Sequence, residues 1–240
     1  MLATLRSTIT STFAAASVLA ALTMSALPAA AQNTAVVELY TSQGCSSCPP
    51  ADALLHELAK RDDVIALALH VDYWDYIGWK DQFAHAAFTE RQKGYARAAG
   101  ARTIYTPQMV IGGKDHVIGN RPGEVAAILA KHYAKAPAVD LDARREGNLA
   151  IVSAPSVRMD KEMIVQIVTY MPSATVAIKR GENAGRTLDY TNVVTSWTVA
   201  ARWDGDDALS MQVDIPSTDP AIVLIQAADH GEILASAKLN

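Results

Sequence analysis

Two cysteines, Cys45 and Cys48, are the residues of this chain whose type and spacing best suit chemistry. They are the only cysteines among 240 residues, and two serines separate them. With no other partner, they are expected to pair with each other. Cysteines three residues apart can act as a reversible dithiol, in which one sulfur attacks a substrate and the other releases the product. The pattern therefore predicts a nucleophilic Cys45 and a resolving Cys48, or a purely structural disulfide.

The residues around the cysteines predict a strand, a tight turn and a helix. Residues 35–40 are short, apolar and β-branched, which is typical of a strand. Pro49 and Pro50 fit only the first turn of a helix, where a missing N–H costs nothing. Cys45 is then expected just before a helix N-terminus, where free N–H groups and the helix dipole favour a thiolate. The apolar run 64–71 predicts a second, parallel strand and so a βαβ unit.

The remaining elements fall into two groups on either side of residues 134–138, whose composition predicts a linker. Before it, residues 83–99 and 124–133 predict helices, and a hairpin is expected around Gly112-Gly113. Beyond it, short strand-like runs predict an antiparallel sandwich of about seven or eight strands. These runs are residues 149–153, 163–170, 174–178, 193–203, 209–215, 221–227 and 233–237.

Several motifs occur in a recognisable order: Gly44-Cys-Ser-Ser-Cys-Pro49, a strand ending in Val71-Asp72, and Ile104-Tyr-Thr-Pro-Gln-Met-Val-Ile-Gly-Gly-Lys114. Over about residues 35–133 this order resembles the thioredoxin superfamily. The resemblance implies that Pro107 is cis, that it faces the cysteine pair, and that Thr106 and Pro107 belong to the substrate-binding site. The Trp-Cys-Gly-Pro-Cys-Lys motif of thioredoxin itself is absent, which argues against a housekeeping reductase.

Three further stretches resemble a narrower group. They are Glu38-Leu-Tyr-Thr-Ser-Gln-Gly-Cys45, His70-Val-Asp-Tyr-Trp-Asp75 and Gly181-Glu-Asn-Ala-Gly-Arg-Thr-Leu188. Together they resemble a secreted thioredoxin-like family that is known only as a domain of unknown function. That resemblance implies a fold rather than a reaction.

The segment after the second strand predicts a substrate-recognition wall. It concentrates aromatic side chains and carboxylates at the strand end where α/β sheets place their ligands. Asp72 and Trp74 are its candidate substrate-binding residues. Asp72 can also carry protons for the cysteines, although a hydrogen-bonded loop carboxylate and a packed Trp74 are the simpler interpretations.

A metal centre is the weaker interpretation of the cysteines. Zinc normally takes four ligands, and there is no second cysteine pair. Cys45, Cys48, Met109 and His70 form a set that can in principle hold a soft copper ion, as in a metallochaperone. We predict no metal site and no cofactor, and keep copper binding as an alternative.

The first 31 residues predict an export signal. Arg6 is followed by the apolar run 13–22, Pro28 and three alanines, a pattern that signal peptidases cleave after Ala31. We therefore expect an exported, periplasmic or secreted protein with no membrane span after cleavage. The net charge of −4 and the lack of a Lys/Arg block argue against a nucleic-acid partner.

The sequence thus predicts an α/β thioredoxin-like N-terminal domain at residues 32–136, followed by an all-β antiparallel sandwich at residues 139–240. The predicted function is thiol:disulfide oxidoreduction on protein or small-molecule thiols through Cys45 and Cys48. The competing hypothesis is a non-catalytic binding module of the cell envelope whose disulfide is static.

Overall fold

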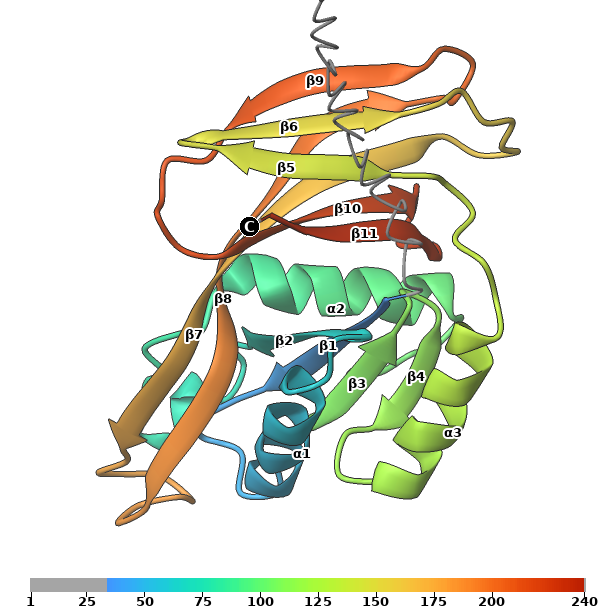
Figure 1. Ribbon diagram of the computed structural model, residues 1–240. Helices are drawn as coiled ribbons and strands as arrows, with labels where there is room; N and C mark the ends of the chain where they lie inside the picture. Colours follow the sequence, from blue (N-terminus) through green and yellow to red (C-terminus); the bar gives the residue numbers. More distant parts are fainter. Residues whose placement is uncertain (1–33, 240) are drawn as a thin grey trace, which may run out of the picture. The chain divides into compact units, whose positions relative to one another are not determined.

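The computed structural model describes residues 34–239 (Figure 1), so the predicted signal peptide at residues 1–31 lies outside them. Strands β1 (Ala35–Thr41) and β2 (Val64–His70) are parallel and are joined by helix α1 (Pro49–Ala59). This arrangement confirms the predicted βαβ unit. Both strands are buried along their whole length, as expected for nearly continuous apolar runs in a parallel pair.

The chain then adds a helix, a hairpin and another helix. The 3₁₀ turn η1 (Asp75–Ile77) precedes α2 (Ala86–Ala98), and the hairpin of β3 (Gln108–Ile111) and β4 (Asp115–Ile118) precedes α3 (Pro122–Tyr133). Strand β3 pairs antiparallel with β1. The hairpin turns at Gly112 and Gly113, both at positive φ, a conformation that costs glycine nothing.

Seven strands make up the rest of the described chain: β5 (Asp142–Glu146), β6 (Leu149–Ala154), β7 (Met163–Ala177), β8 (Thr187–Trp203), β9 (Leu209–Asp214), β10 (Ala221–Ala227) and β11 (Ile233–Leu239). Strand β5 was not predicted, because its sequence, Asp-Ala-Arg-Arg-Glu, is mostly charged. Its pairing with β6 and the half-buried position of Ala143 and Arg145 make it a strand.

The predicted fold class, an α/β thioredoxin-like domain followed by a separate antiparallel sandwich, is wrong. Four strands of the second half join those of the first half in one mixed eight-stranded sheet, ordered β11-β10-β7-β8-β2-β1-β3-β4. Only β5, β6 and β9 form a second, three-stranded sheet. The junction is the parallel contact of β8 with β2, where Val193 lies opposite Ala68 and Asn192 Nδ2 donates to the Ala66 carbonyl at 2.9 Å.

Two predicted strands, 163–170 and 174–178, are one long strand, β7, and the fold class was predicted wrongly for this reason. Pro172 lies inside β7, although proline cannot donate a hydrogen bond to a neighbouring strand. Strand β10 pairs with β7 only from Met163 to Thr169, so Pro172 stands on a stretch that has β8 alone as its neighbour. The long β7–β8 ribbon can therefore continue past the proline and reach β2.

Helices lie on both faces of the part of the large sheet formed by β1–β4 (Figure 1), and the apolar side chains of these strands divide between two cores. Helices α1 and α3 cover one face of β1–β4, with Leu39 and Leu55 among the buried contacts. Helix α2 covers the other face through Phe88 and Tyr95, which pack against strands from both halves of the chain. The three-stranded sheet packs against β7, β10 and β11 in a further core.

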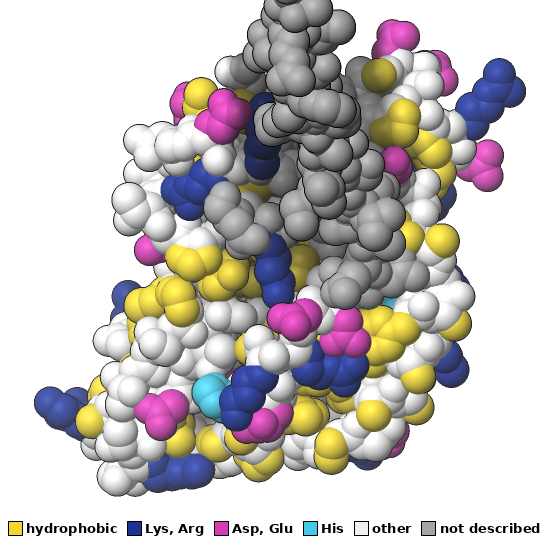
Figure 2. Space-filling view, viewed as in Figure 1, with side chains coloured by type: hydrophobic (Ala, Val, Ile, Leu, Met, Phe, Trp, Pro, Cys, Tyr) yellow, Lys and Arg dark blue, Asp and Glu magenta, His cyan; other side chains and the backbone are white. Residues whose placement is uncertain are grey.

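The described surface carries charges of both signs. Figure 2 shows Lys/Arg and Asp/Glu side chains interspersed with apolar ones over the face in view. None of the helices between residues 34 and 239 combines the length and apolar character that crossing a membrane requires.

Candidate functional site

The two cysteines form a disulfide in the turn between β1 and α1. Their Cα atoms are 5.4 Å apart, and the Cys48 N–H donates to the Cys45 carbonyl at 3.2 Å. Neither cysteine has any exposed surface (0%), whereas Ser46 and Ser47 between them are exposed. The predicted pairing is confirmed, and the sulfur atoms are covered.

Cys48, rather than Cys45, is the residue that caps α1. Pro49 and Pro50 occupy the first helical positions, so these two residues offer no N–H group to the sulfur atoms. A hydroxyl supplies a donor instead: Ser47 Oγ lies 3.4 Å from Cys45 Sγ. A disulfide sulfur carries no hydrogen, so Ser47 donates. The only sequence signal for this residue was its position between the cysteines.

Pro107 and Thr106 lie at the same edge of the sheet as the disulfide. Their peptide bond is cis, as the resemblance implied. Tyr40 pairs with Gln108, so the proline approaches β1 where that strand leads into the cysteine turn. A Cβ placed on Gly119 would lie 3.1 Å from Ala51 Cβ and 3.3 Å from Pro107 Cβ. Pro107 is therefore next to the first turn of α1.

Trp74 joins this group. Its indole Nε1 donates to Thr106 Oγ1 at 2.8 Å. A Cβ placed on Gly44 would lie 3.1 Å from Trp74 Cβ, so the indole stem rests against the cysteine turn. The structure thus brings Trp74, Thr106 and the turn together. Tyr73 lies on the same segment, and burial raises its pKa to about 12.

Asp72 is held by α2 instead. Its carboxylate accepts a hydrogen bond from Thr89 Oγ1 at 2.6 Å, and its backbone N–H donates to the same oxygen at 3.3 Å. This is the hydrogen-bonded loop carboxylate that the sequence offered as the simpler interpretation. The contact fixes the start of the 72–79 segment, and thereby the position of Trp74.

A buried polar network underlies the cysteine turn. His70 Nδ1 lies 2.7 Å from Asp81 Oδ2, and the same carboxylate oxygen accepts from Gln43 N–H at 2.8 Å. Burial acts to raise the pKa of Asp81, but the neighbouring His70 and backbone N–H donors outweigh it and lower the pKa. Trp79 Nε1 donates to Gln43 Oε1 at 2.8 Å, which ties the 72–79 segment to the turn.

A second buried carboxyl, Asp52, lies in the first turn of α1, the helix that Cys48 caps. Cys48 has helical backbone angles, so its side chain and that of Asp52, four positions on, lie on the same side of the helix. Asp52 Oδ1 accepts from Thr41 Oγ1 at 2.8 Å. Burial raises the pKa of Asp52 to about 7, against the opposing effects of His70 and Thr41. The sequence analysis missed this residue, because its surroundings come from β1, β2 and β8.

The loop between β7 and β8 contacts the cysteine turn from the second half of the chain. Asn183 Nδ2 donates to the Gln43 carbonyl at 2.9 Å and to the Cys45 carbonyl at 3.0 Å. Glu182 Oε2 accepts from Ser46 N–H at 3.3 Å. Arg186 Nη1 donates to Asn183 Oδ1 at 3.0 Å, within the same loop.

The residues of the copper alternative are used in other contacts. Met109 is fully buried in the apolar core beneath α1 and α3, and His70 Nδ1 is engaged by Asp81. Within residues 34–239, no three His, Cys, Asp or Glu side chains gather in a way that suits a metal ion.

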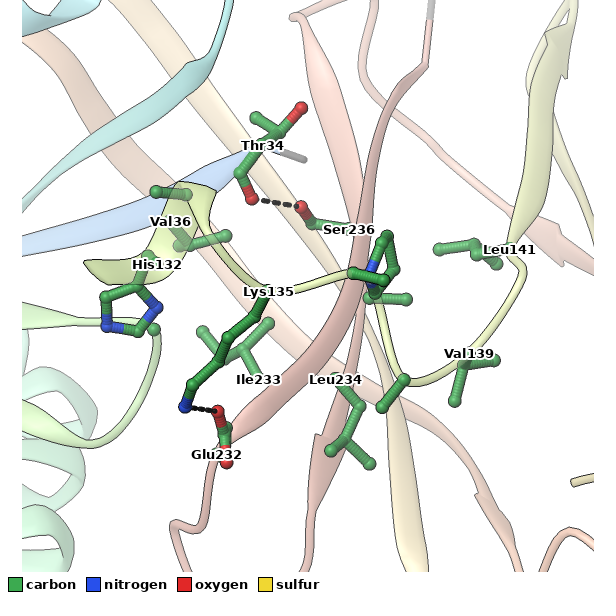
Figure 3. A pocket seen from close by; sticks show the side chains of 16 residues that line it. Thr34, Val36, His132, Lys135, Val139, Leu141, Glu232, Ile233, Leu234 and Ser236 are labelled. Carbon is green, nitrogen blue, oxygen red and sulfur yellow. Dashed lines mark hydrogen bonds and ion pairs between the residues drawn. The ribbon is translucent and has the colours of Figure 1, made fainter. Parts of the chain in front are cut away.

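A surface pocket lies between the start of β1, the segment after α3 and strand β11 (Figure 3). Lys135 and Glu232 form an ion pair at its rim at 3.5 Å. None of the predicted site residues lines it, so it is separate from the disulfide.

A family model and two solved structures are similar to this chain. A family model described as a protein of unknown function (DUF1223) matches residues 36–226. A solved structure from Agrobacterium tumefaciens is 30% identical with a TM-score of 0.74, over 85% of this chain and 93% of that chain. HBP35 of Porphyromonas gingivalis shares the fold at 13% identity and a TM-score of 0.59, over 85% of this chain and 74% of that one. No curated protein matches. The chain therefore belongs to the DUF1223 family, whose function is unknown.

Proposed function

We propose that the protein is a thiol:disulfide oxidoreductase that acts through Cys45 and Cys48. The observation that carries the proposal is the position of the disulfide, which closes the turn leading into α1 beside Pro107, Thr106 and Trp74. A disulfide across three residues adds little to stability by restricting the unfolded chain, because it closes a very short loop. Reversible chemistry is the better explanation of such a pair.

The exchange begins when a substrate thiolate attacks Cys45 Sγ. The Cys45–Cys48 bond breaks, a mixed disulfide forms at Cys45, and Cys48 leaves as a thiolate that takes up a proton. A second thiolate of the substrate then attacks the substrate sulfur and releases Cys45. The substrate loses two electrons and becomes a disulfide, and the protein gains them as a dithiol. The same steps in reverse reduce a substrate disulfide.

Nearby side chains have distinct roles in this proposal. The Ser47 hydroxyl, which already donates to Cys45 Sγ, stabilises the thiolate that forms there. Thr106, Pro107 and Trp74 form the surface on which the substrate chain rests, and Asp72 fixes that surface to α2. Protein thiols or small thiols are the substrate class. Export by the predicted signal would place the protein where disulfides persist.

The proposal is tested first with single cysteine variants of the mature chain. Cys45→Ser is expected to abolish exchange with a dithiol peptide, because it removes the attacked sulfur. Cys48→Ser is expected to trap a mixed disulfide when it is mixed with a disulfide-bonded peptide, because the Cys45 thiolate attacks the peptide disulfide and no second cysteine is left to release it. The product is detected as a mass increase that a reductant reverses. Ser46→Ala is the matched control and should keep full exchange. Full exchange by both cysteine variants would rule out the proposal.

The reduction potential separates catalysis from a structural disulfide. Equilibration of the mature protein with glutathione buffers, with free thiols counted by mass, is expected to give about −120 to −270 mV, the range of exchange proteins. A value below about −300 mV would instead indicate a structural disulfide and favour the binding-module hypothesis.

A further inference from the structure

The loop between β7 and β8, residues 178–186, contacts the cysteine turn although more than 130 residues separate the two. Asn183 is only 1% exposed, and its amide bridges two carbonyls of the turn, those of Gln43 and Cys45. The Glu182 carboxylate accepts from the next N–H, at Ser46. Three of the four positions from Gln43 to Ser46 are therefore held by one loop from the other half of the chain.

The side chain of Ile77 lies between this loop and the turn. A Cβ placed on Gly44 would lie 3.0 Å from Ile77 Cδ1, and one placed on Gly181 would lie 3.3 Å from the same atom. Gly181 adopts φ +77°, a conformation that other residues rarely take. The loop, Ile77 and the turn are thus packed without room for additional atoms.

Because the disulfide is covered, this packing affects how a thiolate can reach Cys45 Sγ. A thiolate must approach Cys45 Sγ from the side opposite Cys48, but neither cysteine has exposed surface. Some part of the cover must therefore move before exchange can start. Asn183 holds the backbone of the turn that carries Cys45, so its hydrogen bonds oppose a movement of that turn.

We propose that Asn183 is a positioning residue of the disulfide site, and that its two hydrogen bonds to the cysteine turn set how fast thiols and other reductants reach Cys45. The inference deepens the proposed function, because it adds a residue from the second half of the chain to the same site. Glu182 acts in the same direction through its weaker, exposed contact with Ser46.

The charged and titratable groups that face the turn are few. They are Glu182 and Arg186 from the hairpin loop, Asp52 on α1, His70 on β2, Asp81 in the following loop and Tyr190 on β8.

The test is the second-order rate constant for reduction of the mature protein by a water-soluble phosphine. Asn183→Asp keeps the shape of the side chain but replaces the donor with an oxygen that faces two carbonyl oxygens. Reduction is expected to be about tenfold faster or more, the size of effect that follows from losing one or two hydrogen bonds. Reoxidation by oxidised glutathione should accelerate by a similar factor, because access changes in both directions.

Asn192→Asp is the matched control. Asn192 lies on β8 and, like Asn183, donates from Nδ2 to a backbone carbonyl, in this case that of Ala66 on β2 rather than one of the cysteine turn. This variant should lose stability and yet be reduced within about twofold of the natural rate. Glu182→Ala, a surface change that leaves the core intact, should give a smaller acceleration than Asn183→Asp and keeps the test open if the latter folds poorly.

Equal reduction rates for Asn183→Asp, Glu182→Ala and Asn192→Asp would overturn the proposal. Faster reduction without faster reoxidation would also overturn it, because the loop would then favour one redox state rather than control access. These rates do not depend on a substrate. Failure of peptide exchange with intact rate effects would therefore count against the proposed function alone.

Discussion

At the scale of single residues, two buried carboxyl groups near the cysteine turn, Asp52 and Asp81, have pKa values that shift in opposite directions. Asp81 is engaged by His70 and two backbone N–H groups, which lower its pKa despite burial. Asp52 has one hydroxyl donor, from Thr41, so burial dominates and raises its pKa to about 7. The number of donors, rather than depth alone, decides which carboxyl stays ionised.

Asp52 makes the stability of the fold depend on pH. Its pKa rises from 3.8 to about 7 on folding, so its stabilising contribution is complete below pH 4 and is lost as pH rises through 7. Between pH 5 and pH 8 the loss amounts to about 3 kcal/mol. Asp52→Asn cannot ionise and still accepts from Thr41, so its stability should change much less over this interval.

Urea unfolding of both proteins at pH 5 and pH 8 measures this difference. Asp81 does not interfere, because its lowered pKa makes its contribution disappear only at pH values below this interval. An equal change in unfolding free energy for the natural protein and Asp52→Asn would show that Asp52 is not the source.

At the scale of elements, one arginine of α2, Arg91, contacts strands from both halves of the chain. Arg91 Nε lies 2.7 Å from Glu38 Oε2 on β1, where Glu38 is fully buried. The same guanidinium donates to Gln226 Oε1 on β10. Its Cζ atom lies 3.7 Å from the centroid of the Trp197 ring on β8. A buried ion pair with its remaining donors satisfied specifies where the helix sits.

Removing the Arg91 guanidinium alone should therefore lower the free energy of unfolding by more than the Arg91–Glu38 ion pair contributes to it. Arg91→Met leaves the Glu38 carboxylate buried without its partner, and we expect a loss of about 3–5 kcal/mol in unfolding free energy. The double variant Glu38→Gln with Arg91→Met should recover part of that loss. Denaturant unfolding of the two variants provides the measurement, and a change below about 1 kcal/mol in Arg91→Met would contradict the assignment.

At the scale of the whole described chain, the two halves share their main sheet and one of its cores. Strand β8 lies beside β2, and the core beneath α2 contains Val168, Val194, Ile222 and Leu224 from the second half. The cysteine turn also receives its Asn183 contacts from there.

A fragment that ends in the predicted linker tests whether the first half of the chain folds without the second half. Residues 32–138, produced without the rest, are expected to lack cooperative thermal unfolding, because the face beneath α2 and the free edge of β2 become exposed. Circular dichroism melts of the fragment and of residues 32–240 make the comparison. A cooperative melt of the fragment, with the disulfide formed, would show that residues 32–138 fold as an independent unit.

The sequence by itself determined the local features of this protein. The pairing of Cys45 with Cys48 follows from their number and spacing, and the helix start follows from Pro49 and Pro50. The βαβ unit follows from apolar runs of strand length on either side of a helical pattern. Each of these features is encoded in one continuous stretch of the chain, the longest being the βαβ unit at residues 35–70.

Only the tertiary structure decided how the two halves meet. The parallel contact of β8 with β2, the enclosure of Asp52 and the Asn183 contact with Cys45 join residues more than 100 positions apart or from several elements. Local periodicity reports which face of a strand is apolar, but it does not report the neighbour that covers that face. Strand order and register place Asn183 against the cysteine turn, because they depend on the packing of the whole sheet.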